Sequence, residues 1–443
     1  MHRKAKSLLA ASANNPGWVV VHDSERDHYE LPVALAEVGA LERFVTDWYT
    51  PLDRTFWQYL AGTSLGKSTF GISKRFRPDL PSRLTADNKL GFGAGYLRRK
   101  LLQRPFLDEV MGGHMGRAAA SIANRRGCHL LAASYSAATA FQALRPGLKR
   151  VLFQVHPHPR FLRSLYRSTM EKDPDYAGLA NEAEATVSEL ELANWEQESA
   201  LADHILCASN FTRRSLEGVG IAAEKISVVP YGVQTQMFEF GRPSGDGPLK
   251  VLFVGQKVAR KGLRTLLRVW KQLQPANAHL VLAGGHVRDE SVLHGFEDQF
   301  IETPRISNAE LVRLFQQADL FVLPSLAEGF GHVYLEALSC GVPIVCTANG
   351  GGADIVSHGE NGWVIPAADP AALADCLSWA LSHRHYLREM REPARALAEN
   401  YSWSRFREGI REVLLPAAAT RKHSFSAFDE TTSEPAVAIK SSA

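Results

Sequence analysis

The sequence of 443 residues predicts an α/β protein with two parallel-sheet domains, and three observations lead to this fold class. Short apolar runs typical of buried strands alternate with segments of helical spacing along most of the chain. The stretch 240–248, Phe-Gly-Arg-Pro-Ser-Gly-Asp-Gly-Pro, has the composition of a linker. After this linker the alternation starts again, and the chain is too long for one ordinary hydrophobic core.

The first half of the chain contains six apolar runs that we expect to be buried strands, and the helix Leu31–Val38 follows the first of them. The expected strands are Trp18–His22, Arg43–Thr46, His129–Ala133, Val151–Val155, Ile205–Ala208 and Ile226–Val229. The region from about 50 to 115 is less regular. We assign residues 17–239 to this domain and residues 1–16 to a flexible N-terminus, whose apolar stretch is very short for a signal peptide.

The second half repeats the pattern after the linker 240–248. The expected strands are Lys250–Val254, Leu280–Ala283, Leu320–Leu323 and Pro343–Cys346. Four apolar residues recur at helical spacing in Lys261–Leu273, which predicts a helix with one buried face. We assign 249–395 to this domain, 396–415 to a C-terminal helix and 416–443 to a disordered tail rich in Ala, Ser, Thr and charge.

Composition excludes several classes of protein. Apolar residues make up 45% and charged residues 22%, as in soluble globular proteins, and a net charge of +3 is too small to indicate nucleic-acid binding. The five cysteines are scattered without Cys-x-x-Cys spacing, which indicates reduced thiols. No apolar run approaches the roughly 18 residues that a membrane span needs. We therefore expect a cytoplasmic protein.

The strongest candidate site follows the expected strand Leu320–Leu323. The glycines of 328–331 let the backbone approach a ligand closely, and a helix that begins near His332 offers free N–H groups to a phosphate. Glu336, one turn into that helix, is suited to accept hydrogen bonds from ribose hydroxyls, and Glu328 to reach towards a sugar. Either carboxylate alone could instead be a surface residue near a helix start.

This segment resembles the Glu-x7-Glu motif of family-4 glycosyltransferases, which are retaining enzymes of the GT-B fold, with two Rossmann-like domains facing each other across a cleft. Further segments resemble the family in the same order along the chain. They are Ala202–Thr212, Ile226–Val233, Val254–Gly262, Glu336–Pro343, Gly350–Gly352 and Asn361–Gly362. The first 150 residues resemble the family only in their strand–helix rhythm.

The resemblance implies an enzyme of polysaccharide biosynthesis that transfers a hexose-type sugar from a nucleotide-diphosphate sugar to a glycan, lipid-linked or small-molecule acceptor. It implies retention of the anomeric configuration, no cofactor and no metal ion. Donor-binding residues carried over from the family are Gln256, Arg260, Lys261, Ile306, Glu328, Phe330, Gly331, His332, Val333 and Glu336. The helix 396–415 is expected to cross back to the first domain.

The basic loop before the helix Lys261–Leu273 also makes chemical sense by itself, because fixed cations stabilise the charge of a leaving nucleoside diphosphate. Lys261 and Arg260 are the candidates. The family often has Arg where this chain has Gln256, and either Lys257 or Arg260 could replace the missing charge.

His156 follows a strand of the first domain, where functional residues of parallel sheets lie. The resemblance implies that it faces the transferred sugar, so that His156, Lys261 and Glu328 form the catalytic set. His158 competes for this role. A metal site with both histidines is a third possibility, although no carboxylate or Cys lies close by in the sequence. The family's Gly-rich loop after the first strand is replaced by His22–Pro32, which contains no glycine.

Two other functions remain open at this point. Ala61–Ser68 fits a relaxed P-loop pattern, which would make the chain an NTPase or phosphotransferase that uses Lys67, but the flanking residues do not look like the required strand and helix. A non-catalytic subunit that binds a nucleotide-sugar is the other, because of Gln256. The basic segments 98–104 and 160–167 are solvated faces or a peripheral contact with the anionic inner membrane face.

Overall fold

The computed structural model describes residues 16–23, 25–53, 75–87, 107–241, 247–285, 292–303 and 306–416. Several predictions therefore fall outside the described residues. They concern the N-terminus before Pro16, the P-loop-like segment with Lys67, the basic segment 98–104 and the tail after residue 416.

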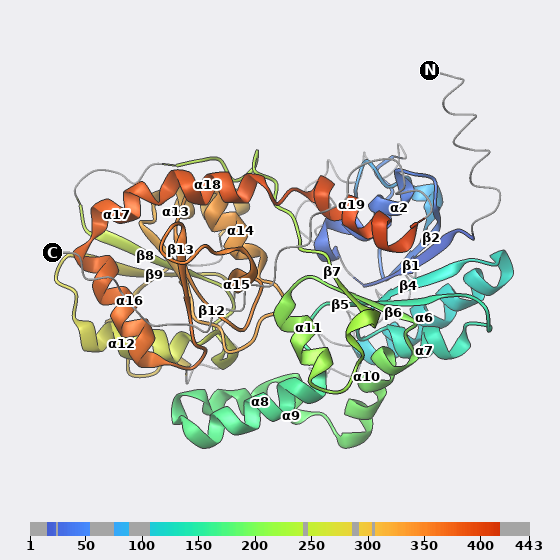
Figure 1. The fold of residues 1–443 in the computed structure, drawn as a ribbon, viewed down its shortest axis with the longest axis horizontal. Helices are drawn as coiled ribbons and strands as arrows, with labels where there is room; N and C mark the ends of the chain where they lie inside the picture. Colours follow the sequence, from blue (N-terminus) through green and yellow to red (C-terminus); the bar gives the residue numbers. More distant parts are fainter. Residues whose placement is uncertain are drawn as a thin grey trace.

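Two parallel sheets organise the chain (Figure 1). The first has seven strands in the order β3-β2-β1-β4-β5-β6-β7, and the second has six in the order β10-β9-β8-β11-β12-β13. The strands of the first sheet are β1 Trp18–Val21, β2 Leu41–Thr46, β3 Thr85–Asp87, β4 His129–Ala133, β5 Arg150–Gln154, β6 His204–Cys207 and β7 Ile226–Val228. The strands of the second are β8 Leu249–Val254, β9 Ala278–Ala283, β10 Ile301–Glu302, β11 Leu320–Leu323, β12 Ile344–Thr347 and β13 Gly362–Ile365.

Helices cover both sheets (Figure 1). Those of the first half are α2 Glu30–Ala36, α6 Leu107–Arg126, α7 Ala137–Ala143, α8 Pro159–Lys172, α9 Ala183–Thr186, α10 Glu189–Leu201 and α11 Asn210–Glu217. Those of the second are α12 Leu263–Leu273, α13 Asn308–Gln317, α14 His332–Ser339, α15 Gly352–Ile355, α16 Pro370–Ser382, α17 Arg384–Glu389, α18 Arg391–Glu399 and α19 Trp403–Leu414. Successive residues of β1 alternate between two apolar clusters, so both faces of this sheet are buried.

The strands predicted from apolar runs are all present, with their ends shifted by at most two residues. The sequence reading missed β3, β10 and β13, which are edge strands of the two sheets. β3 and β10 carry no continuous apolar run, whereas β13 carries the short run Trp363–Ile365, which was overlooked. Residues of β10 are exposed and those of β3 are half-buried.

The predicted helix Lys261–Leu273 was wrong at its start. Residues Ala259–Lys261 form a 3-10 turn, η7, and α12 begins only at Leu263. Gly262 separates the two with a left-handed φ of 66°, and an added Cβ there would collide with the carbonyl oxygen of Pro324. Arg260 and Lys261 therefore lie on a tight turn pressed against the loop that follows β11.

The last helix, α19, lies over the first domain, although it follows α16–α18 of the second (Figure 1). Its Arg407 forms ion pairs with Glu30 and Glu37 of the first domain, and Arg411 reaches Glu37 at 2.7 Å. Glu30 is fully buried at the start of α2. These pairs join the C-terminal end of the described chain to its first helix.

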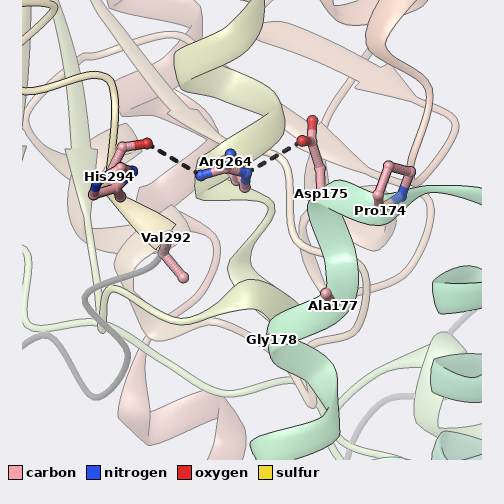
Figure 2. A pocket seen from close by; sticks show the side chains of 7 residues that line it. All are labelled: Pro174, Asp175, Ala177, Gly178, Arg264, Val292 and His294. Atoms are coloured by element: carbon pink, nitrogen blue, oxygen red, sulfur yellow. Dashed lines mark hydrogen bonds and ion pairs between the residues drawn. The ribbon is translucent and has the colours of Figure 1, made fainter.

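A second connection between the domains is made by η5, a 3-10 segment at Pro174–Asn181 that follows α8. Asp175 lies 3.2 Å from Arg264 at the start of α12, and Figure 2 shows this ion pair beside a pocket. Two further arginines, Arg160 and Arg163, pair with Glu189 at 2.8 Å. The charges of these two arginines are thus engaged inside the first domain.

We predict that Gly262→Ala destabilises the protein much more than Gly39→Ala. Both glycines have a left-handed φ, near 70°, but an added Cβ at Gly39 meets no heavy atom within 4 Å. Gly39→Ala should therefore cost only the left-handed penalty of about 1–2 kcal/mol, whereas Gly262→Ala adds a backbone collision. Thermal unfolding of both variants measures the difference, and equal midpoints would contradict this account of the η7 turn.

Candidate functional site

The loop between β11 and α14 touches the first domain at the end of β5. An added Cβ on Gly329 would collide with the carbonyl oxygen of Val155, so only glycine allows this approach. The hydroxyls of Ser209 and Thr212, at the start of α11, both donate to the Gly329 carbonyl oxygen. This loop, residues 324–331, is thus held between the two sheets, directly beside the residue that follows Val155.

Three charged side chains converge at this loop. Lys261 Nζ forms an ion pair and hydrogen bond with Glu328, and Arg260 Nη1 lies 3.6 Å from the same carboxylate. On its other side Arg260 Nε lies 3.5 Å from Glu182, which belongs to the first domain. The side chains of Lys261 and Glu328 are only 10% and 11% exposed, so the pair is largely shielded from water.

Burial alone would raise the pKa of Glu328, but Lys261 and Arg260 override it and hold that pKa at about 2. Burial lowers the pKa of Lys261, because the pull of Glu328 is partly cancelled by the repulsion of Arg260. The lower pKa of Glu328 favours a charged pair, whereas the lower pKa of Lys261 disfavours one. The effect at Glu328 prevails, because this carboxylate faces two cations. Glu328 is the more firmly charged partner of the pair.

His156 is placed to take part in this site, and His158 is not. His156 follows β5, is half-buried, and contributes to the low pKa of Glu328. His158 is 3% exposed, and burial lowers its pKa to about 4, so it is neutral. The His158 N–H donates to Ser215 Oγ at 2.8 Å at the start of α8. The structure therefore gives His158 a place in the core.

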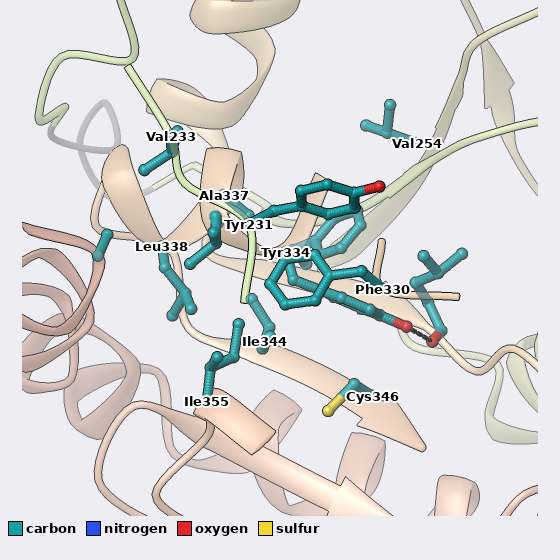
Figure 3. Close-up of a cluster of buried hydrophobic side chains, with 14 of the residues drawn as sticks. Tyr231, Val233, Val254, Phe330, Tyr334, Ala337, Leu338, Ile344, Cys346 and Ile355 are labelled. Atoms are coloured by element: carbon teal, nitrogen blue, oxygen red, sulfur yellow. Dashed lines mark hydrogen bonds between the residues drawn. The ribbon is translucent and has the colours of Figure 1, made fainter. Parts of the chain in front are cut away.

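The first residues of α14 contact both domains. His332 stacks on Tyr231 with ring centroids 4.3 Å apart, and Phe330 meets Tyr231 edge-on at 5.4 Å. Figure 3 shows the rings of Tyr231 and Phe330 next to each other, with Tyr334 close by. Gly331 adopts a left-handed φ of 87° and is the N-cap of α14, where no side chain caps the first N–H groups of the helix.

Asp27 is a site residue that the sequence reading missed. It accepts a hydrogen bond from the Tyr231 hydroxyl at 2.9 Å, and its other oxygen lies 3.3 Å from His332 Nε2. Asp27, His28 and Tyr29 all have left-handed φ values, between 51° and 62°. The loop His22–Pro32, which contains no glycine, thus adopts a backbone that usually favours glycine. Through the Asp27 side chain it contacts the start of α14.

The remaining predicted donor-binding residues differ in their burial and in their partners. Gln256 is exposed, and Ile306 and Val333 are half-buried against the core. Lys257 pairs with Glu302, whereas Arg260 lies beside Glu328. Burial raises the pKa of Glu336, whose carboxylate has no hydrogen bond or ion pair to the other described residues.

The His, Cys, Asp and Glu side chains of the described residues form no group of three or more that could hold a metal ion. Within the same residues, no helix is both long enough and apolar enough to cross a bilayer.

The charge of Glu328 predicts how stability depends on pH. Because its pKa is about 2 in the folded chain and near 4.5 ordinarily, the ion pair stabilises the protein above pH 4.5 and is lost as the pH falls towards 2. Glu328→Gln should therefore cost about 3 kcal/mol at pH 7 and progressively less below pH 4.5.

Denaturant unfolding between pH 3 and pH 8 measures this difference. Glu389→Gln, which removes an exposed carboxylate on α17, is the control and should cost little at any pH. A cost of Glu328→Gln that stays constant down to pH 3 would contradict the charged state assigned here.

The family model described as "Glycosyl transferases group 1" matches residues 235–414. The chain is 30% identical over 254 residues to a D-inositol 3-phosphate glycosyltransferase of Xylanimonas cellulosilytica, covering 51% of this chain and 60% of that protein. It is 28% identical over 196 residues to the amylovoran biosynthesis glycosyltransferase AmsK of Erwinia amylovora, covering 39% and 46%. The chain thus spans about half the length of these curated relatives.

Solved structures match nearly the whole chain. The sucrose-phosphate synthase of Thermosynechococcus elongatus has a TM-score of 0.64 at 18% identity, over 92% of this chain and 100% of that one. HepE of Anabaena, solved in complex with UDP-glucose, has a TM-score of 0.55 at 15% identity, over 90% and 99%. The two facing parallel sheets are those of the GT-B fold. The part of the chain that matches the glycosyl transferases group 1 family model is the one that carries Lys261, Glu328 and Glu336.

Proposed function

We propose that the chain is a retaining glycosyltransferase that transfers a hexose-type sugar from a nucleotide-diphosphate sugar, without a metal ion. The acceptor class that we propose is a glycan, a lipid-linked sugar or a small hydroxylated molecule. One observation carries this proposal: Glu328 is held between Lys261 and Arg260 on a loop that touches the end of β5 next to His156. Cations for a diphosphate and polar groups for a sugar thus meet between the domains.

The second domain would hold the donor. Lys261 and Arg260 would stabilise the charge that develops on the leaving diphosphate, assisted by the free N–H groups at the start of α14. Glu336, one turn into α14, has a carboxylate that is free of other described partners and could accept hydrogen bonds from ribose hydroxyls. Ile306 precedes Ser307, the N-cap of α13, and would contact the base.

The transferred sugar would lie between Glu328 and His156. Glu328 is largely shielded from water and His156 is half-buried, and each side chain can bond a sugar hydroxyl. The close contact of the two domains at Gly329 would limit the access of water during transfer, which reduces hydrolysis of the donor.

The comparisons support this class of substrate. HepE was solved with UDP-glucose, and the printed names of the curated relatives refer to D-inositol 3-phosphate and to amylovoran biosynthesis. Uridine diphosphate sugars are therefore the first donors to test. A non-catalytic binding subunit is less well supported, because Arg260 supplies the second cation that Gln256 lacks.

We predict that Lys261→Ala and Glu328→Ala each lower the rate of sugar transfer by about 10²–10³-fold, because each removes a fixed charge from the reacting region. Lys250→Ala is the matched control: it removes a lysine from the same strand–turn unit, at the opposite end of β8, and should keep full activity. Product formation from UDP-sugars, measured on variants with unchanged thermal unfolding, tests this. Full activity of Glu328→Ala would reject the site.

We also predict that the product keeps the anomeric configuration of the donor and that a chelator leaves the rate unchanged. NMR of the product linkage tests the first expectation, and assays with and without EDTA test the second. An inverted linkage would contradict the retaining assignment, and loss of activity in EDTA would contradict the metal-independent one. If Lys67→Ala abolished activity while Glu328→Ala did not, the phosphotransferase alternative would replace this proposal.

A further inference from the structure

An acidic segment of the first domain covers the turn that carries Arg260 and Lys261. We call residues 173–182, with Asp173, Asp175 and Glu182, the acidic strap. It contains η5 and continues from α8, the helix that starts three residues after His156. The strap is thus joined to the acceptor side of the cleft, while its carboxylates face the other domain.

The strap is matched by arginines spaced four residues apart on η7 and α12. Glu182 lies 3.5 Å from Arg260, Asp175 lies 3.2 Å from Arg264, and Arg268 lies 3.0 Å from Asp175 and 3.5 Å from Asp173. Figure 2 shows the middle pair beside a pocket of about 420 Å³, which the strap and the second domain line together.

Apolar packing fixes the strap over the donor loops. Tyr176 and Leu179 are fully buried in a cluster that also contains Ala259, Leu326 and Ala327 of the second domain. Ala259 begins the η7 turn, and the other two precede Glu328. The strap therefore lies directly on the two segments that would hold a donor, and its position is fixed by more than charge.

The charges of this region leave no excess for a diphosphate. Arg260 and Lys261 are balanced by Glu328 and Glu182, and Gln256 adds nothing. Arg260 meets its two carboxylates at 3.5 and 3.6 Å, longer than the roughly 2.7–2.9 Å of a charge-assisted hydrogen bond. Its guanidinium is thus shared loosely, whereas a phosphate could bind it in the two-pronged geometry that arginine favours.

We propose that the acidic strap is an autoinhibitory contact, in which Glu182 occupies Arg260 and gives it up when the diphosphate of a nucleotide-sugar binds. The inference rests on the proposed function, because it names a competitor for the same cation. Glu328 belongs to the donor loop itself, so Glu182, which comes from the other domain, is the carboxylate that can leave. Because Tyr176 and Leu179 hold the rest of the strap in place, only the Glu182 side chain would have to turn away when the donor binds.

The test is the affinity for UDP, GDP and ADP, measured by calorimetry on the full chain and on Glu182→Gln. Removing the competing charge should tighten binding of the preferred nucleotide by about tenfold. Asp173→Asn is the matched control: it removes one strap charge two helical turns away from Arg260, can still cap η5, and should change affinity less than twofold. In an Arg260→Gln background, Glu182→Gln should have no further effect.

The possible results separate a failure of the autoinhibitory contact from a failure of the proposed function. Unchanged or weaker binding by Glu182→Gln, in a variant with the same melting temperature without nucleotide, overturns the autoinhibitory contact, and weaker binding would make Glu182 a residue that positions Arg260. Glu182→Ala must give the same sign, since it also removes the charge. If neither the unaltered chain nor Glu182→Gln binds any of the three nucleotides, the proposed function itself fails and the strap has no ligand to compete with.

Discussion

The placement of Glu328 between Lys261 and Arg260 is the constraint on which the rest of this structure depends. Three charges within a largely dehydrated space are tolerated only where each has an opposite partner at short range. The backbone has to bring η7 and the loop after β11 together for this purpose. Gly262 allows that approach, because a side chain there would collide with the Pro324 carbonyl oxygen, and Gly329 allows the same loop to approach Val155 of the first domain for the same reason.

The contact at Gly329 also determines how the two domains are related. The loop that carries Glu328 is held against the end of β5 by hydroxyls of α11, and the start of α14 is held by Tyr231 and Asp27. Of the two long-range connections, α19 on α2 joins other parts of the domains, whereas the acidic strap on α12 reaches this centre through Glu182 and Arg260. The cleft is therefore closed around charged groups, and the domains share one electrostatic environment at the site.

The close pairing of these charges bears on how the site could bind a diphosphate. A diphosphate needs surplus positive charge, yet burying an unpaired cation is costly in free energy. Pairing Arg260 with Glu182 offsets that cost while the site is empty. The carboxylate of this ion pair comes from the first domain, as the proposed competition between Glu182 and a diphosphate requires.

Much of the fold was predictable from the sequence, and the site was predictable in part. Apolar runs located every central strand, because a strand buried on both faces must be apolar along its length. The edge strands β3, β10 and β13 were missed, and their residues are less buried than those of the central strands. The order of glycines and carboxylates after β11, together with the basic turn after β8, predicted from the sequence that Lys261, Glu328 and Glu336 lie in one region.

Tertiary structure alone decided the rest, because spacing along the chain says nothing about partners far away in sequence. It placed His158 in the core, and it brought Arg260 to Glu328 while Lys257 pairs with Glu302. It brought Asp27 to His332 across 305 positions and Glu182 to Arg260. The sequence determined which chemical groups follow each strand; only folding determined which of them face one another, because that depends on how two separate sheets come together.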